Sequence, residues 1–326
     1  MSKLFGITLG DASGIGPEVL LKAFREGQIR HPAIVYGDVG PLSYYNRMLG
    51  YGVPLHAVQS AAEWKPGVLN ILDHGILHEA DITPGIINAN AGRAAREYVI
   101  SAARAALNRD IAAMVTLPMN KEATQLSDPK FVGHTELIGA VCGVDDVTIM
   151  LVSDDLIVTH VSTHCSLADA IVRAKQPRIR TILKLTCDAV GKLMPEPRIA
   201  VAGLNPHAGE HGLFGREEIE EIGPAIEWAK AQGMPVEGPF PPDTLFYMAV
   251  RRKRFDAIVC MYHDQGHVPL KLLDFEGGVN VALGLPIIRT SVDHGTAFHI
   301  AGRGVAGHGS FVKALEFAVS MAGSKS

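Results

Sequence analysis

Short apolar runs alternate along the chain with longer segments in which apolar residues recur every three or four positions. In the first part of the chain, residues 3–10, 33–37 and 111–118 are short apolar runs, and each predicts a β-strand. Residues 14–26 and 90–110 carry the repeat of an amphipathic helix. The pattern therefore begins as strand, helix, strand, helix, strand.

The rest of the chain continues this alternation and adds one hairpin. Residues 147–162 hold two apolar runs joined by Ser153, Asp154 and Asp155, a pattern that predicts two antiparallel strands. The remaining predicted strands are 198–207, 255–265, 278–284 and 286–292, and the remaining predicted helices are 166–193 (broken near Pro177), 217–233 and 310–323. Strands that alternate with helices indicate an α/β fold with doubly wound, mostly parallel sheets.

The loops that follow the strands are the first place to look for function, because ligands of such folds bind beside the carboxyl ends of the strands. Six polar clusters of this chain follow an apolar run: TLGDASGIG, TLPMNK, THVSTHC, GLNPHAGE, MYHDQG and TSVDHGT. A purely structural sheet does not need histidines at these positions. We therefore expect the functional residues to lie in these loops.

Three histidines stand out in these loops, namely His164, His207 and His263, each just past an apolar run. The last two stand near a carboxylate, Glu210 and Asp264 respectively. Three neutral imidazoles with an open position suit a divalent metal that polarises an alcohol C–O bond and lowers the pKa of the hydroxyl. The alternative is that some of them only cap helices and that His207 is a turn residue.

A second set of residues suits an anionic ligand: Lys271, Asn280 and Arg289, together with His134 and Thr135. Lys and Arg side chains that flank a pair of strands are suited to a phosphate or a carboxylate. Ordinary surface charge is the alternative for any one of them. Arg289 is the strongest member, because it is expected to end an apolar strand directly before TSVDHGT, an uncommon place for an idle cation.

Two glycine-rich loops could let the backbone approach a ligand. Residues 10–16 (GDASGIG) do not match the GxGxxG dinucleotide fingerprint, and Asp38 lies too near a glycine turn to serve as the acid of that motif. Residues 294–310 could wrap the adenosine end of a cofactor, and a plain surface loop is the alternative.

Two residues are candidates for proton transfer. Lys121 follows an apolar strand and would carry a proton only if it were desolvated. Asp243 follows two prolines, where it could place a carboxylate at the site or act only as a helix N-cap.

The composition is that of an ordinary globular protein, since the 326 residues are 47% hydrophobic and 20% charged, with a formal net charge of −4. We see neither a basic patch for nucleic acid nor a Lys/Arg block for a membrane surface, so a small-molecule substrate is expected. No apolar run is long enough to span a bilayer, and the glycine-interrupted N-terminus is unlike a signal peptide. The four cysteines form no CxxC pair, so reduced thiols and a cytoplasmic location are expected.

Taken together, several segments resemble the 4-hydroxythreonine-4-phosphate dehydrogenase (PdxA) family of vitamin B6 synthesis. The segments are GDASGIGPE, GHTELI, THCSL, GLNPHAGE, PPDTLF, YHDQGHVPLK, GGVNVALGLPIIRTSVDHGTAF and IAGRGVA. They are specific as a set, and they span nearly the whole chain. The family has the isocitrate/isopropylmalate dehydrogenase-like fold, so the resemblance implies a two-lobed α/β enzyme.

The resemblance assigns roles to the residues already singled out. It implies that His164, His207 and His263 bind one divalent metal (Zn, Co, Mg, Mn or Ni), in a homodimer that shares the metal site between subunits. It implies that the second set binds the substrate: His134, Thr135, Lys271, Asn280 and Arg289. It also implies NAD or NADP as the cofactor, oxidation of a secondary alcohol β to a carboxylate, and loss of CO2 from the resulting β-keto acid.

Two departures from the family pattern leave alternatives open. The stretch YHDQGHVPLKLLDFEGGVN is closer to a branch that acts on 4-phospho-D-threonate or 4-phospho-D-erythronate, and members near that branch oxidise dihydrodiols of aromatic acids. The resemblance places the cofactor loop at His294, Gly295, Thr296, Ala297 and His299. Relatives usually carry an acid where this chain has His299, so the choice between NAD and NADP stays open.

The predicted first lobe is discontinuous and consists of residues 1–110 and 266–326, the second lobe is residues 111–265, and the active site is expected in the cleft between them. Two other classes of protein are less consistent with the sequence. An acyltransferase of the same broad fold would need neither a nicotinamide nor three histidines. A non-catalytic binding protein would not need three histidines in equivalent positions after the strands.

Overall fold

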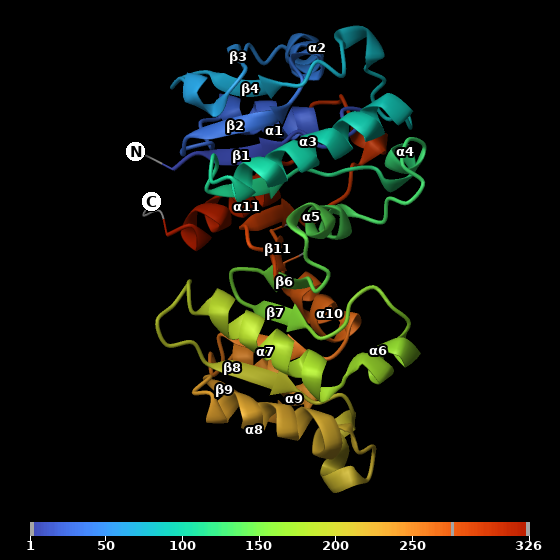
Figure 1. The fold of residues 1–326 in the computed structure, drawn as a ribbon, viewed down its shortest axis with the longest axis vertical. Helices are drawn as coiled ribbons and strands as arrows, with labels where there is room; N and C mark the ends of the chain where they lie inside the picture. Colours follow the sequence, from blue (N-terminus) through green and yellow to red (C-terminus); the bar gives the residue numbers. More distant parts are fainter. Residues whose placement is uncertain (1–2, 275–276, 324–326) are drawn as a thin grey trace. The chain divides into compact units, whose positions relative to one another are not determined.

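The computed structural model describes residues 3–274 and 277–323, which form a mixed α/β protein (Figure 1). The chain divides into two compact units, Met1–Val147 with Leu285–Ser326, and Thr148–Gly284. We call them unit 1 and unit 2 and describe each by itself.

Unit 1 is built on a parallel sheet with the strand order β3-β4-β2-β1-β5-β12. Its strands are β1 (Phe5–Thr8), β2 (Ala33–Gly37), β3 (Leu55–Val58), β4 (Leu69–Asp73), β5 (Ala113–Thr116) and β12 (Arg289–Val292). Every residue of β1, β2 and β5 is buried, as expected for a parallel sheet with helices on both faces. The predicted strands at residues 3–10, 33–37 and 111–118 are therefore confirmed.

The helices of unit 1 are α1 (Gly16–Arg25), α2 (Val39–Leu49), α3 (Ala89–Leu107), α4 (Lys121–Gln125), α5 (His134–Cys142) and α11 (Gly309–Met321), with short 3₁₀ turns at Ala61–Glu63, Glu79–Asp81 and Phe298–Ile300. Asn88 is the N-cap of α3, because its side-chain oxygen accepts hydrogen bonds from the backbone N–H of Asn90 and Ala91 at 2.9 and 3.2 Å. Gly92 lets α3 approach α4 closely, because a Cβ there would lie 2.3 Å from the Ala123 carbonyl.

Unit 2 is built on a mixed sheet with the order β11-β6-β7-β10-β8-β9. Its strands are β6 (Thr148–Val152), β7 (Ile157–His160), β8 (Ile199–Ala202), β9 (Val236–Phe240), β10 (Ala257–Cys260) and β11 (Val279–Leu283). Strand β6 is antiparallel to β7 and β11, and the other pairs are parallel. The predicted hairpin is confirmed, since Ser153 closes it by donating its N–H to the Leu156 carbonyl at 2.9 Å.

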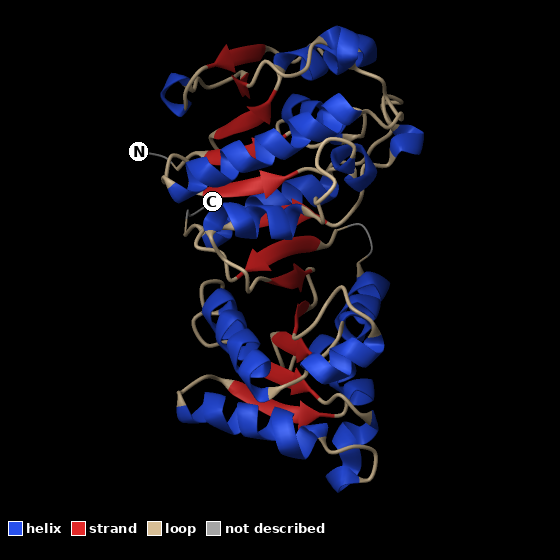
Figure 2. Ribbon diagram, turned by 45° about the vertical axis from the view of Figure 1, so that its right-hand side comes forward, coloured by secondary structure: helices blue, strands red, loops and turns tan. Residues whose placement is uncertain are grey.

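The helices of unit 2 are α6 (Leu167–Arg173), α7 (Gln176–Val190), α8 (Gly223–Ala231), α9 (Pro242–Val250) and α10 (His263–Leu273), with a 3₁₀ segment at Pro206–Gly212 and a π-helical turn at Glu218–Ile222. Figure 2 shows helices on both sides of the strands within this unit. The break predicted near Pro177 lies between α6 and α7, at the extended residue Lys175. None of the described helices is long and apolar enough to cross a membrane.

The observed division of the chain differs from the predicted boundaries at 110/111 and 265/266. Residues 111–147 stay with unit 1, because β5 pairs with both β1 and β12 and because α4 and α5 pack on α3. Residues 266–284 belong to unit 2, because β11 pairs with β6. The sequence pattern predicts where a strand lies but not which strands it pairs with. The unit to which β5 and β11 belong therefore could not be predicted from it.

Candidate functional site

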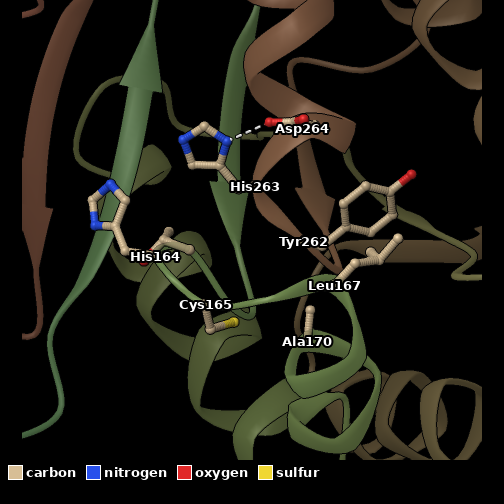
Figure 3. Close-up of a pocket in the computed structure, with 8 residues that line it drawn as sticks. His164, Cys165, Leu167, Ala170, Tyr262, His263 and Asp264 are labelled. Carbon is tan, nitrogen blue, oxygen red and sulfur yellow. Dashed lines mark hydrogen bonds and ion pairs between the residues drawn. The ribbon is translucent and has the colours of Figure 1, made fainter.

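A pocket of about 510 Å³ in unit 2 lies where the loop after β7 and the first turn of α6 meet the start of α10 (Figure 3). The loop ends at Ser166, whose hydroxyl accepts a hydrogen bond from the Asp169 N–H at 3.1 Å and so caps α6. The residues that line the pocket are Thr163, His164, Cys165, Leu167, Ala170, Tyr262, His263 and Asp264.

Two of the three predicted metal histidines, His164 and His263, lie in this pocket with their ring centroids 5.7 Å apart. The Nδ1 atom of His263 is 2.6 Å from the Asp264 carboxylate, which leaves Nε2 for a ligand (Figure 3). A carboxylate on one ring nitrogen orients an imidazole that binds a metal through the other. These two side chains therefore fit two positions of a divalent metal site.

Two further histidines, which the sequence did not single out, pack against His263. The His267 ring stacks on the His263 ring with centroids 3.6 Å apart and an interplanar angle of 12°. Its Nδ1 atom lies 3.2 Å from Nε2 of His160, which is fully buried at the end of β7. Burial, with His267 adding to it, lowers the pKa of His160 to about 3 and keeps that ring neutral. His267 follows His263 by four residues, a signal that becomes visible once residues 263–273 are known to be helical.

His207 lies elsewhere in unit 2, in a second pocket of about 410 Å³ whose other lining residues are Ala208, Glu210, His211, Pro239 and Pro241. The residue is exposed and belongs to a run of left-handed backbone from His207 to His211, with φ between 41° and 77°. Glycine is normally needed for such angles, so four other residues that adopt them in one turn mark a constrained segment.

Within residues 3–274 and 277–323, no group of three or more His, Cys, Asp and Glu side chains is arranged to hold a metal ion. His164 and His263 share one pocket, whereas His207 lines another. The described residues of one chain therefore do not bring the three imidazoles together, and a three-histidine site with a ligand from a second chain, as the resemblance implies, stays a prediction.

Arg289 is the first residue of β12 and does not end a strand, contrary to the expectation from the sequence. The residues before it form bends, and pairing with β5 starts only at Arg289, opposite Met114. The side chain is 3% exposed, and its Nε and Nη2 atoms donate to the Thr116 hydroxyl at 3.1 and 2.7 Å. Burial lowers the pKa of this guanidinium to about 10, although the charge of Glu136 opposes the shift. No carboxylate in the described part of the chain pairs with it.

His134 is the first residue of α5 in the same unit. Burial, assisted by the charge of Arg289, lowers its pKa to about 3, so the ring is neutral. A hydrogen bond to the Leu117 backbone opposes this shift, while Nε2 is inaccessible and has no partner among the described residues. The charge of Arg289 acts on the His134 ring, so the two side chains lie near each other in unit 1, but their role in binding an anion stays a prediction.

The other members of the predicted substrate set are divided between the units. Thr135 is half-buried in the first turn of α5, in unit 1. Lys271 and Asn280 belong to unit 2, in the last turn of α10 and in β11. The Asn280 Oδ1 atom is buried, and no described residue donates a hydrogen bond to it.

The two candidates for proton transfer are both exposed. Lys121 is the first residue of α4, so the desolvation that its role requires is absent from this structure. Asp243 stands in the first turn of α9, and the N-cap of that helix is Pro241. The N-cap interpretation of Asp243 is therefore wrong, because α9 begins at Pro242.

The predicted cofactor loop runs from the end of β12 through the 3₁₀ turn at Phe298–Ile300. Ala297 has a left-handed φ of 44°, His294 Nε2 is buried without a described partner, and His299 is exposed. This loop contacts the other glycine-rich loop, since Ile15 donates its N–H to the Thr296 carbonyl at 3.1 Å.

Asp11, in the first glycine-rich loop, is a buried carboxyl that the sequence did not single out. Burial raises its pKa to about 6, although hydrogen bonds from the backbone of Ser13 and Asn120 oppose the shift. Its Oδ2 atom has no partner in the described chain. Asp38, by contrast, is structural: its carboxylate accepts a hydrogen bond from the Tyr98 hydroxyl at 2.5 Å.

Residues 28–318 match the sequence profile of the family described as pyridoxal phosphate biosynthetic protein PdxA. The chain belongs to the PdxA family. Among its curated relatives in the family, a D-threonate 4-phosphate dehydrogenase of Cupriavidus necator is 44% identical over 98% of this chain and 97% of its own length. A 4-hydroxythreonine-4-phosphate dehydrogenase of Desulforapulum autotrophicum is 42% identical over 98% and 95%. Since these PdxA relatives are dehydrogenases, the chain is an oxidoreductase that acts on a CH–OH group.

Solved structures of the PdxA family have the same fold. A 4-hydroxythreonine-4-phosphate dehydrogenase from Klebsiella pneumoniae is 41% identical, covers 98% of this chain and 100% of its own, and gives a TM-score of 0.88. An isocitrate dehydrogenase from Methylococcus capsulatus, at 12% identity and a TM-score of 0.51 over 99% and 86% of the two chains, is similar in fold alone. The predicted isocitrate dehydrogenase-like α/β fold is thus confirmed.

Proposed function

We propose that this protein is a metal-dependent NAD(P) dehydrogenase that oxidises the secondary alcohol of a phosphorylated hydroxy acid, after which the β-keto acid loses CO2. The substrates that fit are 4-phospho-D-threonate, 4-phospho-D-erythronate and 4-hydroxythreonine 4-phosphate. Relatives named for two of these substrates cover nearly the whole chain. The functional unit is a homodimer.

The observation that carries this proposal is the buried guanidinium of Arg289. A buried cation is unfavourable unless an anion compensates it. Thr116 offers only a hydroxyl, and Glu136, whose charge acts on Arg289, makes no ion pair with it among the described residues. A phosphate or carboxylate oxygen would supply the missing charge through charge-assisted hydrogen bonds. His134 supports the same ligand, because its hydrogen bond to the Leu117 backbone leaves the orphaned Nε2 as an acceptor for a substrate hydroxyl.

The donor chemistry of His164 and His263 supports a divalent metal in the pocket of unit 2. When bound there, such an ion would polarise the C–O bond of the substrate and lower the pKa of its hydroxyl. Asp264 holds the His263 ring by its Nδ1 atom, and His267 restrains the plane of the same ring by stacking. His207 of a second copy would complete the set of three imidazoles.

The loop at residues 294–299 is the proposed cofactor site. Bound NAD(P) would accept the hydride from the carbinol carbon. The buried His294 Nε2 atom and the backbone of the left-handed Ala297 are polar groups that this loop can offer. The exposed His299 could pair with a 2′-phosphate if it is protonated, so NADP is included with NAD.

A second candidate is a dihydrodiol dehydrogenase for an aromatic carboxylic acid with the same metal site. A terephthalate 1,2-cis-dihydrodiol dehydrogenase from Burkholderia xenovorans is 29% identical, covers 99% of both chains and gives a TM-score of 0.72. The buried Arg289 would serve a carboxylate as well as a phosphate.

A substrate panel separates the two candidates. Absorbance at 340 nm is followed with the three phosphorylated acids and a terephthalate dihydrodiol, each with NAD and with NADP, before and after treatment with a chelator. We expect reduction with a phosphorylated acid that stops on chelation and returns with added Co²⁺ or Zn²⁺. Reduction with the dihydrodiol alone would favour the second candidate, and full activity after exhaustive chelation would remove the metal.

A further inference from the structure

We propose that Glu218 is the positioning residue of the turn that presents His207, so that loss of its carboxylate weakens metal binding although it touches no metal ligand side chain. The inference rests on the proposed metal role of His207. Its first premise is the backbone of that turn, and its second is the set of bonds that Glu218 makes.

The turn from His207 to His211 is strained. Among the described residues, seven residues other than glycine have positive φ, and four of them are His207, Ala208, Glu210 and His211. The left-handed conformation is less favourable than the right-handed one for such residues. They adopt it only where contacts with the surrounding structure compensate the cost. Something next to the turn must therefore hold it.

The Glu218 carboxylate lies in the right place to do so. The residue is 5% exposed at the start of the π-helical turn. Its Oε1 atom accepts hydrogen bonds from the backbone N–H of Leu204 and Asn205 at 2.7 and 2.8 Å, and Oε2 accepts one from the Asn205 side chain at 2.9 Å. These donors come just before His207 in the chain, so the carboxylate holds the backbone that leads into the turn.

The carboxylate also packs against the middle of the turn. A Cβ on Gly209 would lie 2.6 Å from Glu218 Oε2, so only a glycine leaves room for it there. Glu217 holds the same Asn205 amide at 2.7 Å. In the described chain, no Lys or Arg pairs with Glu218, so its charge is compensated by N–H donors of the His207 segment. A buried carboxylate used in this way ties the turn more strongly than a neutral acceptor would.

The test uses the full-length protein stripped of metal. Glu218→Leu removes both acceptor oxygens, and Glu218→Gln keeps the shape and one of them. Glu220→Gln is the matched control, because Glu220 is an exposed residue of the same π-helical turn that pairs with Arg216 at 2.5 Å. Co²⁺ affinity is measured by titration calorimetry, and the visible spectrum of the Co²⁺ complex and the amide hydrogen exchange of residues 204–214 are recorded at a temperature where every variant is folded.

We expect Glu218→Leu to weaken Co²⁺ binding by about 10- to 100-fold, the range found when a group that orients a ligand is lost. Glu218→Gln should weaken it less, and Glu220→Gln should stay within about twofold of the wild type. The Leu variant should also exchange the amides of residues 204–214 faster and change the Co²⁺ spectrum. If the Gln variant alone folds, it is compared with the control in the same way.

The outcomes separate this inference from the proposed function. Unchanged Co²⁺ affinity and spectrum in the Glu218 variants, even with a lower melting temperature, would show a merely structural residue and overturn the inference. A wild-type protein that binds no Co²⁺ or Zn²⁺ would overturn the metal site itself. In that case the hydrogen exchange of residues 204–214 still tests whether Glu218 holds the turn. Equal exchange rates in the Glu218 variants and the wild type would refute that role.

Discussion

Arg289 and Asp11 are buried ionisable side chains of unit 1, and the half-buried His134 in the same unit has an inaccessible Nε2 atom. No described carboxylate pairs with Arg289, and His134 Nε2 and Asp11 Oδ2 have no hydrogen-bond partner in the described chain. Buried polar groups are nearly always paired in folded proteins, and exceptions concentrate where a ligand completes the set. The sequence predicted a ligand-binding role for Arg289 and His134 but not for Asp11.

Replacement of Arg289 by lysine tests the anion site. Lysine keeps the charge but loses the planar fork that binds two oxygens of a phosphate, so we expect the KM for a phosphorylated substrate to rise at least about tenfold. Arg104→Lys, on the exposed side of α3, is the control and should leave KM unchanged. Steady-state kinetics provide the measurement, and an unchanged KM for Arg289→Lys would refute the phosphate role.

The carboxyl of Asp11 predicts a pH dependence of stability. Its pKa is raised from 3.8 to about 6 in the folded protein, so the folded state holds this proton more tightly than the unfolded state. The stabilisation is complete below pH 3.8 and is lost as pH rises through 6. Asp11→Asn cannot ionise, so its stability relative to the wild type should rise by about 1–2 kcal/mol between pH 5 and pH 8. Melting temperatures at both pH values measure this, and a difference that does not change with pH would contradict it.

At the scale of elements, the apolar runs predicted most strands, and the break near Pro177 and the hairpin at Ser153 were also predicted. Three strands, β3, β4 and β9, were not predicted, and neither were the helices α2, α4, α5, α9 and α10. These segments are short, lack a clear period or follow prolines. The prediction of the site was least accurate at His263, which was assigned to a strand that ends at Cys260. Since α10 begins at His263, the stack with His267 could not be predicted from a strand period.

Gly92 in α3 predicts an effect opposite to helix propensity. Alanine in a helix interior is usually more favourable than glycine by about 1 kcal/mol. Here the added Cβ would lie 2.3 Å from the Ala123 carbonyl, so α4 must move, and we expect Gly92→Ala to lower the free energy of unfolding by about 1–3 kcal/mol.

Gly309→Ala at the first residue of α11 is the control for Gly92→Ala. A Cβ at Gly309 meets nothing within 4 Å, so the Gly309→Ala variant should be at least as stable to heat as the wild type. An equal loss in both variants, or a gain at Gly92, would contradict the close approach of α3 and α4.

At the scale of the whole molecule, two predicted metal histidines share a pocket and the third lines another. The family and the fold followed from segments spread along the chain, but a shared site depends on a second copy, and no periodicity of one sequence reports that. The proposed homodimer therefore makes the molecule, not the chain, the catalytic unit.

Mixing experiments test this arrangement. His207→Ala and His263→Ala should each be inactive, and re-pairing of equal amounts should restore about one quarter of wild-type activity, since half of the dimers are mixed and each has one complete site. His164→Ala mixed with His263→Ala is the control and should not recover, because both side chains line one pocket of one chain. No recovery in the first mixture would argue against ligands from two subunits.

The unpaired guanidinium at the start of β12 also bears on how long a molecule survives. An anion that binds only the folded chain lowers the population of opened forms by mass action. Proteases attack those forms, so the protein without a bound anion should be degraded faster than the protein with one. The half-life of this enzyme in a cell should accordingly lengthen when its anionic substrate is abundant and shorten when that substrate is depleted.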